Sequence, residues 1–264
     1  METITSRQNA RFREIKKLIE NKRYREETGS FFVDGVNFVA QALANNWEIL
    51  SLVYVPSEID TDYKKKILSL VPDEKHFPVD KNLYEALSVK KDVQGVGGVF
   101  KQKLTRSEIL PGTGVVLENI ANPGNLGSIA RLCAAFGINN LYIIKPAVEF
   151  FHPEVVRASM GGLFHLNLVE FDSIGRLSEE MKKTDYFGIG TSLQDDSVNL
   201  SVFNKDYGQS ERILVLFGSE AKGLSTEAKN TCQTLLRIPI HERVDSLNVA
   251  ESAAIVLYEL FVKK

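Results

Sequence analysis

Cysteine and clustered histidine are scarce in this chain of 264 residues. Its two cysteines, Cys133 and Cys232, fall in expected helices without metal-like spacing, and the four histidines form no HExxH or cysteine–histidine cluster. A disulfide framework or a structural zinc site is therefore not expected, and neither is any other metal. We interpret both thiols as small buried side chains in a reducing compartment.

Long apolar runs and a strong charge of one sign are also missing. The net charge is −2 and the pI about 6.2, so any nucleic acid must bind a local patch and not the surface as a whole. The first residues lack the apolar region of a signal peptide, and no run approaches membrane-spanning length. We therefore expect a cytoplasmic protein with no membrane partner.

The first hundred residues predict a small α/β domain. An amphipathic helix is expected over residues 6–27, ended by Gly29. Its many basic residues are typical of a solvated face, but Arg7, Asn9 and Arg11 at its start also suit phosphate contacts. Apparent strands and helices follow at residues 30–33, 36–44, 49–55, 63–70 and 95–100.

Residues 101–114 mix charge, Pro and Gly and mark the expected boundary between a domain of residues 1–105 and one of residues 113–264. The second region alternates helix patterns with apolar strands, which are expected at residues 115–117, 141–144, 166–169, 186–189 and 213–217. This alternation predicts a parallel sheet with helices on both faces. The carboxyl ends of its strands would meet at one edge, where ligands usually bind.

Three polar turns stand out in this second region, and the first is ENIANPGNLGSIARLCAAFG at residues 118–137. The residues Ile129, Leu132, Cys133 and Phe136 form an apolar helical stripe. Arg131 points away from that stripe, on a surface of small residues that would let a ligand or a second backbone come close. Asn125 stands where the helix cap is expected.

The second turn is LVLFGSEAKGLS at residues 214–225, where an apolar strand runs into Gly218, Ser219 and Glu220. Its spacing approaches that of a phosphate-binding P-loop, but Leu224 stands where the lysine must be. Phosphate binding is therefore a poor interpretation. Backbone contacts to a small ligand and simple turn chemistry both remain open.

The third turn is RIPIHERVDSLNVAESAAIVL at residues 237–257. The apolar residues before it predict a short strand over residues 235–240, although Pro239 lies inside that run and weakens it. A polar loop follows at residues 241–246. Asn248 then precedes Glu251 by three residues, the spacing of a capping box, so a helix cap is the favoured local interpretation.

Taken together and in this order, the three turns resemble the three motifs of the SpoU/TrmH family of RNA 2′-O-ribose methyltransferases, in the SPOUT superfamily. The resemblance runs from about residue 115 to the end and includes residues 152–166, HPEVVRASMGGLFHL. The first hundred residues, with SRQNARF and FFVDG, resemble the extra N-terminal domain of longer members. That domain is a small α/β RNA-binding fold like a large-subunit ribosomal protein.

The resemblance implies a SPOUT-type parallel sheet with a C-terminal trefoil knot, an exception to the rule against threaded chains. It also implies S-adenosylmethionine as cofactor, a homodimer, and RNA as the other partner. The implied cofactor-binding residues are Thr191, Gly218, Ile238 and Leu247, and the implied catalytic residues are Arg131, Asn125, Glu220 and Asn248. Candidate RNA contacts are Arg7, Asn9, Arg11, Arg157 and Ser159.

One residue departs from the family pattern, because Ala250 stands where many relatives have serine. A mechanism that needs this hydroxyl is therefore in doubt. The extra N-terminal domain favours 2′-O-methylation of a nucleotide in large-subunit rRNA. Alternatives that stay open are a tRNA 2′-O-methyltransferase, a SPOUT base methyltransferase and a non-catalytic ribosome-assembly protein.

Overall fold

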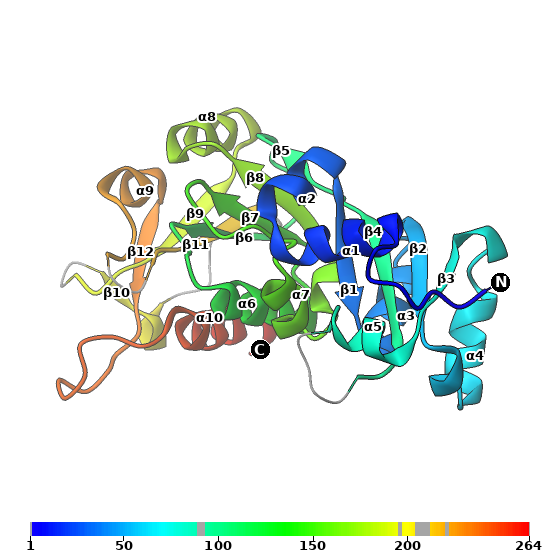
Figure 1. The fold of residues 1–264 in the computed structure, drawn as a ribbon. Helices are drawn as coiled ribbons and strands as arrows, with labels where there is room; N and C mark the ends of the chain where they lie inside the picture. Colours follow the sequence, from blue (N-terminus) through cyan, green and yellow to red (C-terminus); the bar gives the residue numbers. More distant parts are fainter. Residues whose placement is uncertain (1, 89–92, 195–196, 204–211, 220–221, 264) are drawn as a thin grey trace. The chain divides into compact units, whose positions relative to one another are not determined.

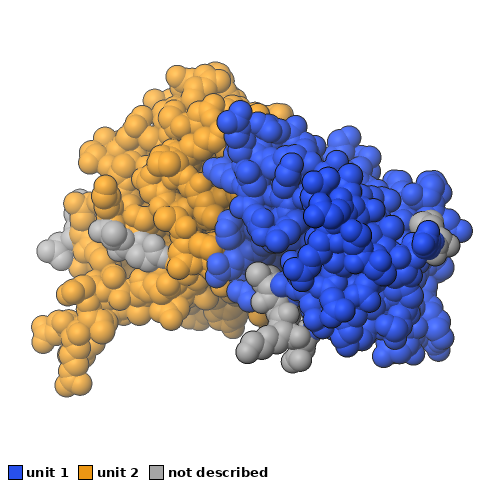
Figure 2. All heavy atoms as spheres, in the orientation of Figure 1, with its two compact units in different colours: residues 1–103, 151–164 blue, residues 104–150, 165–264 orange. Residues whose placement is uncertain are grey.

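The computed structural model describes residues 2–88, 93–194, 197–203, 212–219 and 222–263 (Figure 1). The chain divides into two compact units, coloured separately in Figure 2. Unit 1 comprises residues 1–103 and 151–164, and unit 2 comprises residues 104–150 and 165–264. The predicted domains, residues 1–105 and 113–264, differ from these units in residues 151–164, which the prediction assigned to the second domain, and at the boundary, where unit 2 begins at residue 104. No helix within the described ranges is long and apolar enough to cross a membrane.

Unit 1 contains a mixed four-stranded sheet of order β1-β4-β2-β3. Strand β4 is antiparallel to β1 and β2, whereas β2 and β3 are parallel. The strands are β1 (Ser30–Asp34), β2 (Ile49–Tyr54), β3 (His76–Pro78) and β4 (Val96–Lys101). The helices are α1 (Ala10–Glu20), α2 (Lys22–Thr28), α3 (Val36–Ala44), α4 (Asp62–Ser69), α5 (Lys81–Glu85) and α7 (Pro153–Ala158).

The single helix predicted over residues 6–27 is wrong, because the chain forms two helices that meet at Asn21. The extended backbone of Asn21 (φ −126°) ends α1, and its side chain accepts a hydrogen bond from the Tyr24 amide to cap α2. Helix α1 begins only after Asn9, whose side chain accepts from the Phe12 amide. Gly29 ends α2 in the left-handed conformation, as predicted.

Residues 151–164 belong to unit 1 through an aromatic cluster. The ring of Phe151 lies 4.7 Å from that of Phe31, centroid to centroid, and Trp47 packs edge-on against Phe164 at 5.5 Å. The Trp47 indole N–H also donates to the Phe164 carbonyl at 3.0 Å. Large buried aromatic rings whose polar N–H is hydrogen-bonded contribute strongly to packing. This packing explains why residues 151–164 belong to unit 1 although the residues on both sides of them belong to unit 2.

Unit 2 contains an eight-stranded sheet of order β10-β12-β9-β11-β6-β7-β8-β5 in which every neighbouring pair is parallel. The predicted parallel α/β sheet is therefore confirmed, while the knot stays a prediction. The strands are β5 (Thr105–Arg106), β6 (Gly114–Glu118), β7 (Asn140–Ile144), β8 (Asn167–Phe171), β9 (Phe187–Thr191), β10 (Val198–Asn199), β11 (Ile213–Phe217) and β12 (Thr234–Arg237).

Helices cover both faces of this sheet. Helices α6 (Pro123–Ala135) and α10 (Val249–Leu257) lie side by side on one face, and α8 (Ile174–Thr184) and α9 (Thr226–Thr231) lie on the other (Figure 1). Every residue of β6 and β11 is buried, as expected for parallel strands covered on both faces. The parallel arrangement places the carboxyl ends of β6, β9, β11 and β12 at one edge.

The strand predicted over residues 235–240 is shorter in the structure. Strand β12 ends at Arg237, and Ile238 and Ile240 lie in the segment after it. Pro239 has no N–H to donate to a neighbouring strand, which accounts for the early end of the ladder. The two isoleucine side chains are consequently free to face the edge where the strands end.

Candidate functional site

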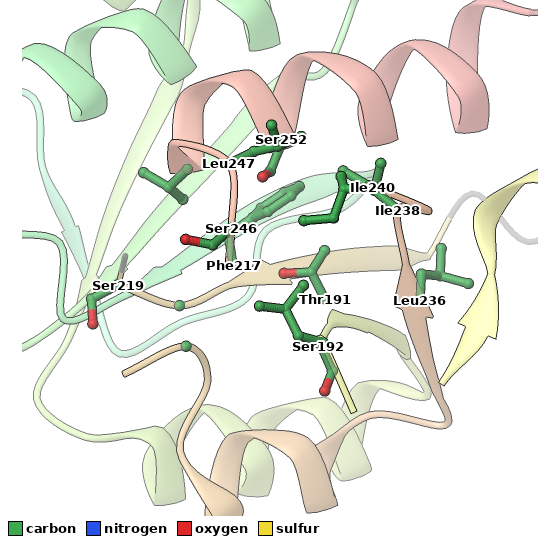
Figure 3. A pocket seen from close by; sticks show the side chains of 14 residues that line it. Thr191, Ser192, Phe217, Ser219, Leu236, Ile238, Ile240, Ser246, Leu247 and Ser252 are labelled. Carbon is green, nitrogen blue, oxygen red and sulfur yellow. The ribbon is translucent and has the colours of Figure 1, made fainter. Parts of the chain in front are cut away.

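A pocket opens at the carboxyl ends of β9, β11 and β12, next to the start of α10 (Figure 3). It is lined by Thr191, Ser192, Leu193, Phe217, Gly218, Ser219, Gly223, Leu236, Ile238, Ile240, Ser246, Leu247, Val249 and Ser252. All four residues predicted to bind the cofactor, Thr191, Gly218, Ile238 and Leu247, are among them. The structure thus brings residues from the second and third turns, and from the end of β9, around one space.

The hydroxyl groups at this pocket were mostly missed from the sequence. Ser246 and Ser252 line it together with Ser192, whereas Ala250 does not. Ser252 lies on α10, and Figure 3 shows it among the side chains that line the pocket. The third turn therefore supplies other hydroxyl groups to the pocket, although Ala250 has none. Since Ser252 is two residues beyond Ala250 in the helix, helical spacing alone does not identify it.

The turn after β11 is held by an unusually close backbone approach. A Cβ atom on Gly218 would lie 2.0 Å from the Gly223 carbonyl carbon and 2.2 Å from its oxygen. The Gly223 amide donates to the Ser219 carbonyl at 2.8 Å, and Gly223 has a left-handed φ of +63°. Any side chain on Gly218 would force this turn apart. The predicted catalytic residue Glu220 lies outside the described residues.

Asn125 is not the helix cap that the sequence predicted. The cap of α6 is Asn122, whose side chain accepts from the Asn125 amide at 3.2 Å. Pro123 at the first helical position, where its missing N–H costs nothing, fixes this start. Asn125 instead lies buried in the first turn, 9% exposed, and its Oδ1 accepts from Asn248 Nδ2 at 3.1 Å.

Asn248 caps α10, as predicted, because its Oδ1 accepts from the Ala250 amide at 2.8 Å. The Asn248 side chain thus makes two hydrogen bonds: its oxygen caps α10, and its nitrogen donates to Asn125 in the first turn. Leu247, its neighbour in the chain, lines the pocket. The first turn is therefore tied to the wall of the pocket by a side-chain hydrogen bond between α6 and α10.

The substitution Asn248→Asp separates these two hydrogen bonds. Aspartate keeps an acceptor for the Ala250 amide but has no N–H, so helix capping survives while the bond that Asn248 donates is lost, and the Asn125 amide would have to turn over to replace it. We expect thermal stability close to that of the wild type and a clear fall in the methyl transfer that the resemblance implies. Asn248→Ala is the matched comparison and should also lose about 1 kcal/mol of stability. Full activity of Asn248→Asp would contradict a role for the link.

Arg131 is exposed on α6 and does not line the pocket. Within the described part of the chain, its side chain makes no hydrogen bond or ion pair. An unpaired guanidinium on a surface is available to bind an anionic group such as an RNA phosphate. The structure leaves its predicted catalytic role as a proposal.

The predicted RNA contacts differ in availability. Arg7 is exposed, and Arg157 is exposed with one weak ion pair to Glu154 at 3.9 Å. By contrast, Arg11 donates to Ser51 Oγ at 2.9 Å and lies over the Phe77 ring. Burial lowers the pKa of the Arg11 guanidinium from its ordinary value, which fits a side chain turned into unit 1.

Ser159 and Asn9 need correction as RNA contacts. Ser159 is fully buried, and its hydroxyl donates to the Val156 carbonyl at 2.8 Å, so it does not reach a phosphate in this conformation. The Asn9 side chain is engaged as the cap of α1, although it is partly exposed. The prediction for Asn9 rested on its place beside Arg7 and Arg11, and that for Ser159 on the resemblance of its segment to the family. The sequence did not reveal that local backbone groups already use their side chains.

Among the described residues there is neither a reactive cysteine nor a group of side chains that could form a metal centre. Cys133 is buried, and burial raises the pKa of the Cys232 thiol to about 12. A thiol that holds its proton is a poor nucleophile. No group of three or more His, Cys, Asp or Glu side chains in the described ranges could hold a metal ion. The pocket with its three turns remains the candidate site.

Comparison with known families identifies this arrangement. The model of the SpoU rRNA Methylase family matches residues 112–258, and that of the MRM3-like substrate binding domain matches residues 9–98. The chain therefore belongs to the SpoU rRNA Methylase family. The resemblance inferred from the three turns is confirmed, and with it an RNA methyltransferase with an N-terminal substrate-binding domain.

Similar proteins cover almost the whole chain. A 23S rRNA (uridine(2479)-2′-O)-methyltransferase of Streptomyces viridochromogenes is 29% identical over 97% of this chain and 90% of its own length. The 23S rRNA (guanosine(2553)-2′-O)-methyltransferase RlmP of Bacillus subtilis is 24% identical over 98% of this chain and 99% of its own. Both match the predicted substrate class.

Solved structures show the same fold. The crystal structure of an rRNA methyltransferase from Sinorhizobium meliloti has a TM-score of 0.85 and 26% identity, covering 98% of this chain and 96% of that one. The SpoU methyltransferase AviRb of S. viridochromogenes, in complex with the cofactor AdoMet, has a TM-score of 0.84 and 26% identity, with 96% and 98% covered. S-adenosylmethionine as the family's cofactor is thus confirmed.

Proposed function

We propose that this chain methylates the 2′-hydroxyl of one nucleotide in 23S rRNA and binds S-adenosylmethionine in the pocket of Figure 3. The observation that carries this proposal is the convergence of Thr191, Gly218, Ile238 and Leu247 on one space. Both full-length relatives carry 2′-O-methyltransferase names, but they act on different nucleotides. The individual target therefore has to be measured.

The pocket suits a ligand with an apolar ring system and several polar groups. Phe217, Ile238 and Ile240 supply apolar walls, and Ser246 and Thr191 supply hydroxyls. The close turn at Gly218 exposes backbone groups at the pocket wall, where no side chain could fit. Such a combination of apolar walls with a few placed polar groups is usual for cofactor sites.

The reaction depends mainly on alignment. S-adenosylmethionine supplies a methyl group on a sulfonium centre. Holding two reactants in a near-attack geometry is worth about 7–11 kcal/mol. The hydrogen bond between Asn125 and Asn248 fixes the residue next to Leu247, which lines the pocket, and so supports this alignment. Arginine stays protonated in proteins, so we assign Arg131 to the target phosphate and the developing oxyanion, and not to direct proton removal.

The homodimer is part of the same proposal. Ile255 on α10 is 42% exposed and Tyr258, just beyond that helix, is 50% exposed. Exposed apolar side chains that lie close together favour a protein partner, and a second copy would cover them. A dimer would also allow Arg131 to serve the partner's site. Light scattering on the purified protein measures its mass directly.

Product analysis tests the proposed reaction. The purified protein is incubated with S-adenosylmethionine carrying a labelled methyl group and, in separate reactions, with 23S rRNA and with tRNA from a strain that lacks this protein. Nuclease digestion should release one labelled 2′-O-methyl nucleoside, and primer-extension stops should map its position. A base-methylated nucleoside would favour the base methyltransferase alternative, and label on tRNA alone would favour the tRNA enzyme. No product with any RNA would favour a non-catalytic assembly role.

The salt dependence of RNA binding tests the RNA contacts. Each neutralised phosphate contributes about 0.7–0.9 to the slope of log affinity against log salt. We expect Arg7→Ala and Arg157→Ala each to reduce that slope by about this amount, because both side chains are exposed. Ser159→Ala is the matched control and should leave it unchanged, since its hydroxyl is buried. An unchanged slope for an arginine variant would remove that residue from the RNA surface.

A further inference from the structure

Glu118, the last residue of β6, is a buried carboxylate that accepts two hydrogen bonds from a residue distant in the chain. Its side chain is 4% exposed and, within the described ranges, has no ion-pair partner. Its Oε2 accepts from the Ser225 amide at 2.8 Å, and its Oε1 accepts from the Ser225 hydroxyl at 2.7 Å. Burying a carboxylate is costly unless hydrogen bonds satisfy it, and here both bonds come from one residue.

Ser225 ends the turn that begins at Gly218. Between these two residues lie Ser219 and Gly223, which line the pocket with Gly218. Strand β11 fixes the beginning of the turn, and the bonds to Glu118 fix its end. Ser225 Oγ also accepts from the Ala228 amide at 3.1 Å, so the same hydroxyl starts α9.

Glu118 itself does not line the pocket. It is separated from Ser225 by 107 residues in the chain but adjoins the first turn, where α6 begins. We propose that Glu118 is a positioning residue that acts through Ser225 to hold the pocket-lining residues Ser219 and Gly223 in the arrangement that binds S-adenosylmethionine. This inference rests on the proposed function of the pocket. It adds a connection between the first and second turns to the Asn125–Asn248 connection between the first and third.

The geometry predicts which substitutions keep the connection. In Glu118→Gln, the amide oxygen still accepts from the Ser225 N–H, and the amide nitrogen can donate to Ser225 Oγ after the hydroxyl rotates. In Glu118→Ala, both bonds are lost and the Ser225 amide has no partner from β6. A positioning role therefore predicts rescue by glutamine, although glutamine carries no charge.

The experiment compares the two variants by calorimetric binding of S-adenosylmethionine and by RNA affinity. Glu118→Ala should weaken cofactor binding about tenfold or more, and Glu118→Gln should stay within about threefold of the wild type. RNA affinity should not change in either variant. A wild-type cofactor affinity in Glu118→Ala, or equal losses in the two variants, would overturn the positioning role.

Asn140→Ala controls for general destabilisation. Asn140 is also fully buried, and its amide donates to the Pro111 carbonyl at 2.9 Å. It pairs with Gly114 at the opposite end of β6, whereas Glu118 pairs with Ile144. Asn140→Ala should lower the thermal midpoint without changing cofactor affinity. If it weakens cofactor binding as much as Glu118→Ala does, the effect is one of overall stability and the inference fails.

Hydrogen exchange separates this inference from the proposed function. The Ser225 amide in the protein without cofactor should exchange faster in Glu118→Ala and at the wild-type rate in Glu118→Gln. Unchanged exchange in Glu118→Ala would overturn the connection whatever the pocket binds. Failure of the wild-type protein to bind S-adenosylmethionine, with the exchange pattern as expected, would overturn the function of the pocket and leave the structural connection standing.

Discussion

Gly218→Ala is expected to weaken S-adenosylmethionine binding about a hundredfold and to abolish measurable methyl transfer. The added Cβ would lie 2.0 Å from the Gly223 carbonyl carbon, a backbone atom that cannot rotate away. Overpacking costs about 1–3 kcal/mol, and this contact belongs at the upper end of that range. The variant relieves the clash by opening the turn. Cofactor binding must then close the turn again, and the free-energy cost of this closure weakens the affinity.

Gly175→Ala is the matched control for this prediction. Gly175 lies in α8, and its added Cβ would meet the movable end of the Glu227 side chain at 3.1 Å and, in ordinary van der Waals contact, the Ser173 hydroxyl at 3.8 Å. Alanine is also preferred over glycine in a helix, by about 1 kcal/mol. We expect unchanged cofactor affinity and equal or higher thermal stability. Calorimetric binding measures both variants, and near-wild-type affinity of Gly218→Ala would show that the turn does not contact the ligand.

The parallel sheet and the position of the pocket could be predicted from the sequence. Apolar strands that alternate with helices have few alternative arrangements, and their carboxyl ends must share an edge. For this reason Thr191, Gly218 and Ile238 line one pocket although the first ends β9 and the other two follow β11 and β12. The family resemblance added the identity of the ligand, which the spacing of residues alone did not provide.

The predicted starts and ends of helices were wrong at two places. Asn122 and Asn125 are both good helix caps, and only the preference of Pro123 for the first helical position decides between them. Asn21 looked like the interior of one amphipathic helix, but it ends one helix and caps the next. The apolar stripe lies wholly before Asn21, and residues 22–28 contain only Tyr24 as an apolar residue, so periodicity gave no support for one helix continuing across Asn21.

Two long-range contacts could not be predicted. The sequence gives no sign that residues 151–164 join the aromatic cluster of unit 1. The Glu118 carboxylate finds its partner 107 residues away, and nothing in ENIANPGN distinguishes it from a surface acid. Burial of these groups is decided by tertiary packing, which local pattern does not encode.

Arg131→Ala is expected to lower the turnover number about 10²- to 10³-fold, the usual effect of removing one group that stabilises developing negative charge. Cofactor affinity should stay within about threefold of the wild type, because Arg131 does not line the pocket. Stability should change by less than about 0.5 kcal/mol, since the side chain is exposed. Single-turnover methyl transfer and calorimetry measure these quantities. Arg176→Ala, which removes an exposed arginine paired with Glu179 on α8, is the control and should be fully active.

Arg131→Lys distinguishes an anchor from a base. Lysine keeps the charge but loses the planar fork that binds phosphate with two bonds, so an anchoring role predicts partial activity at every pH. Lysine gives up its proton more readily than arginine, so a base would gain activity over Arg131 as the pH rises toward about 10. A rate for Arg131→Lys that overtakes the wild type at high pH would therefore contradict the anchor. Equal loss of cofactor binding and turnover in Arg131→Ala would instead place the guanidinium in the cofactor site.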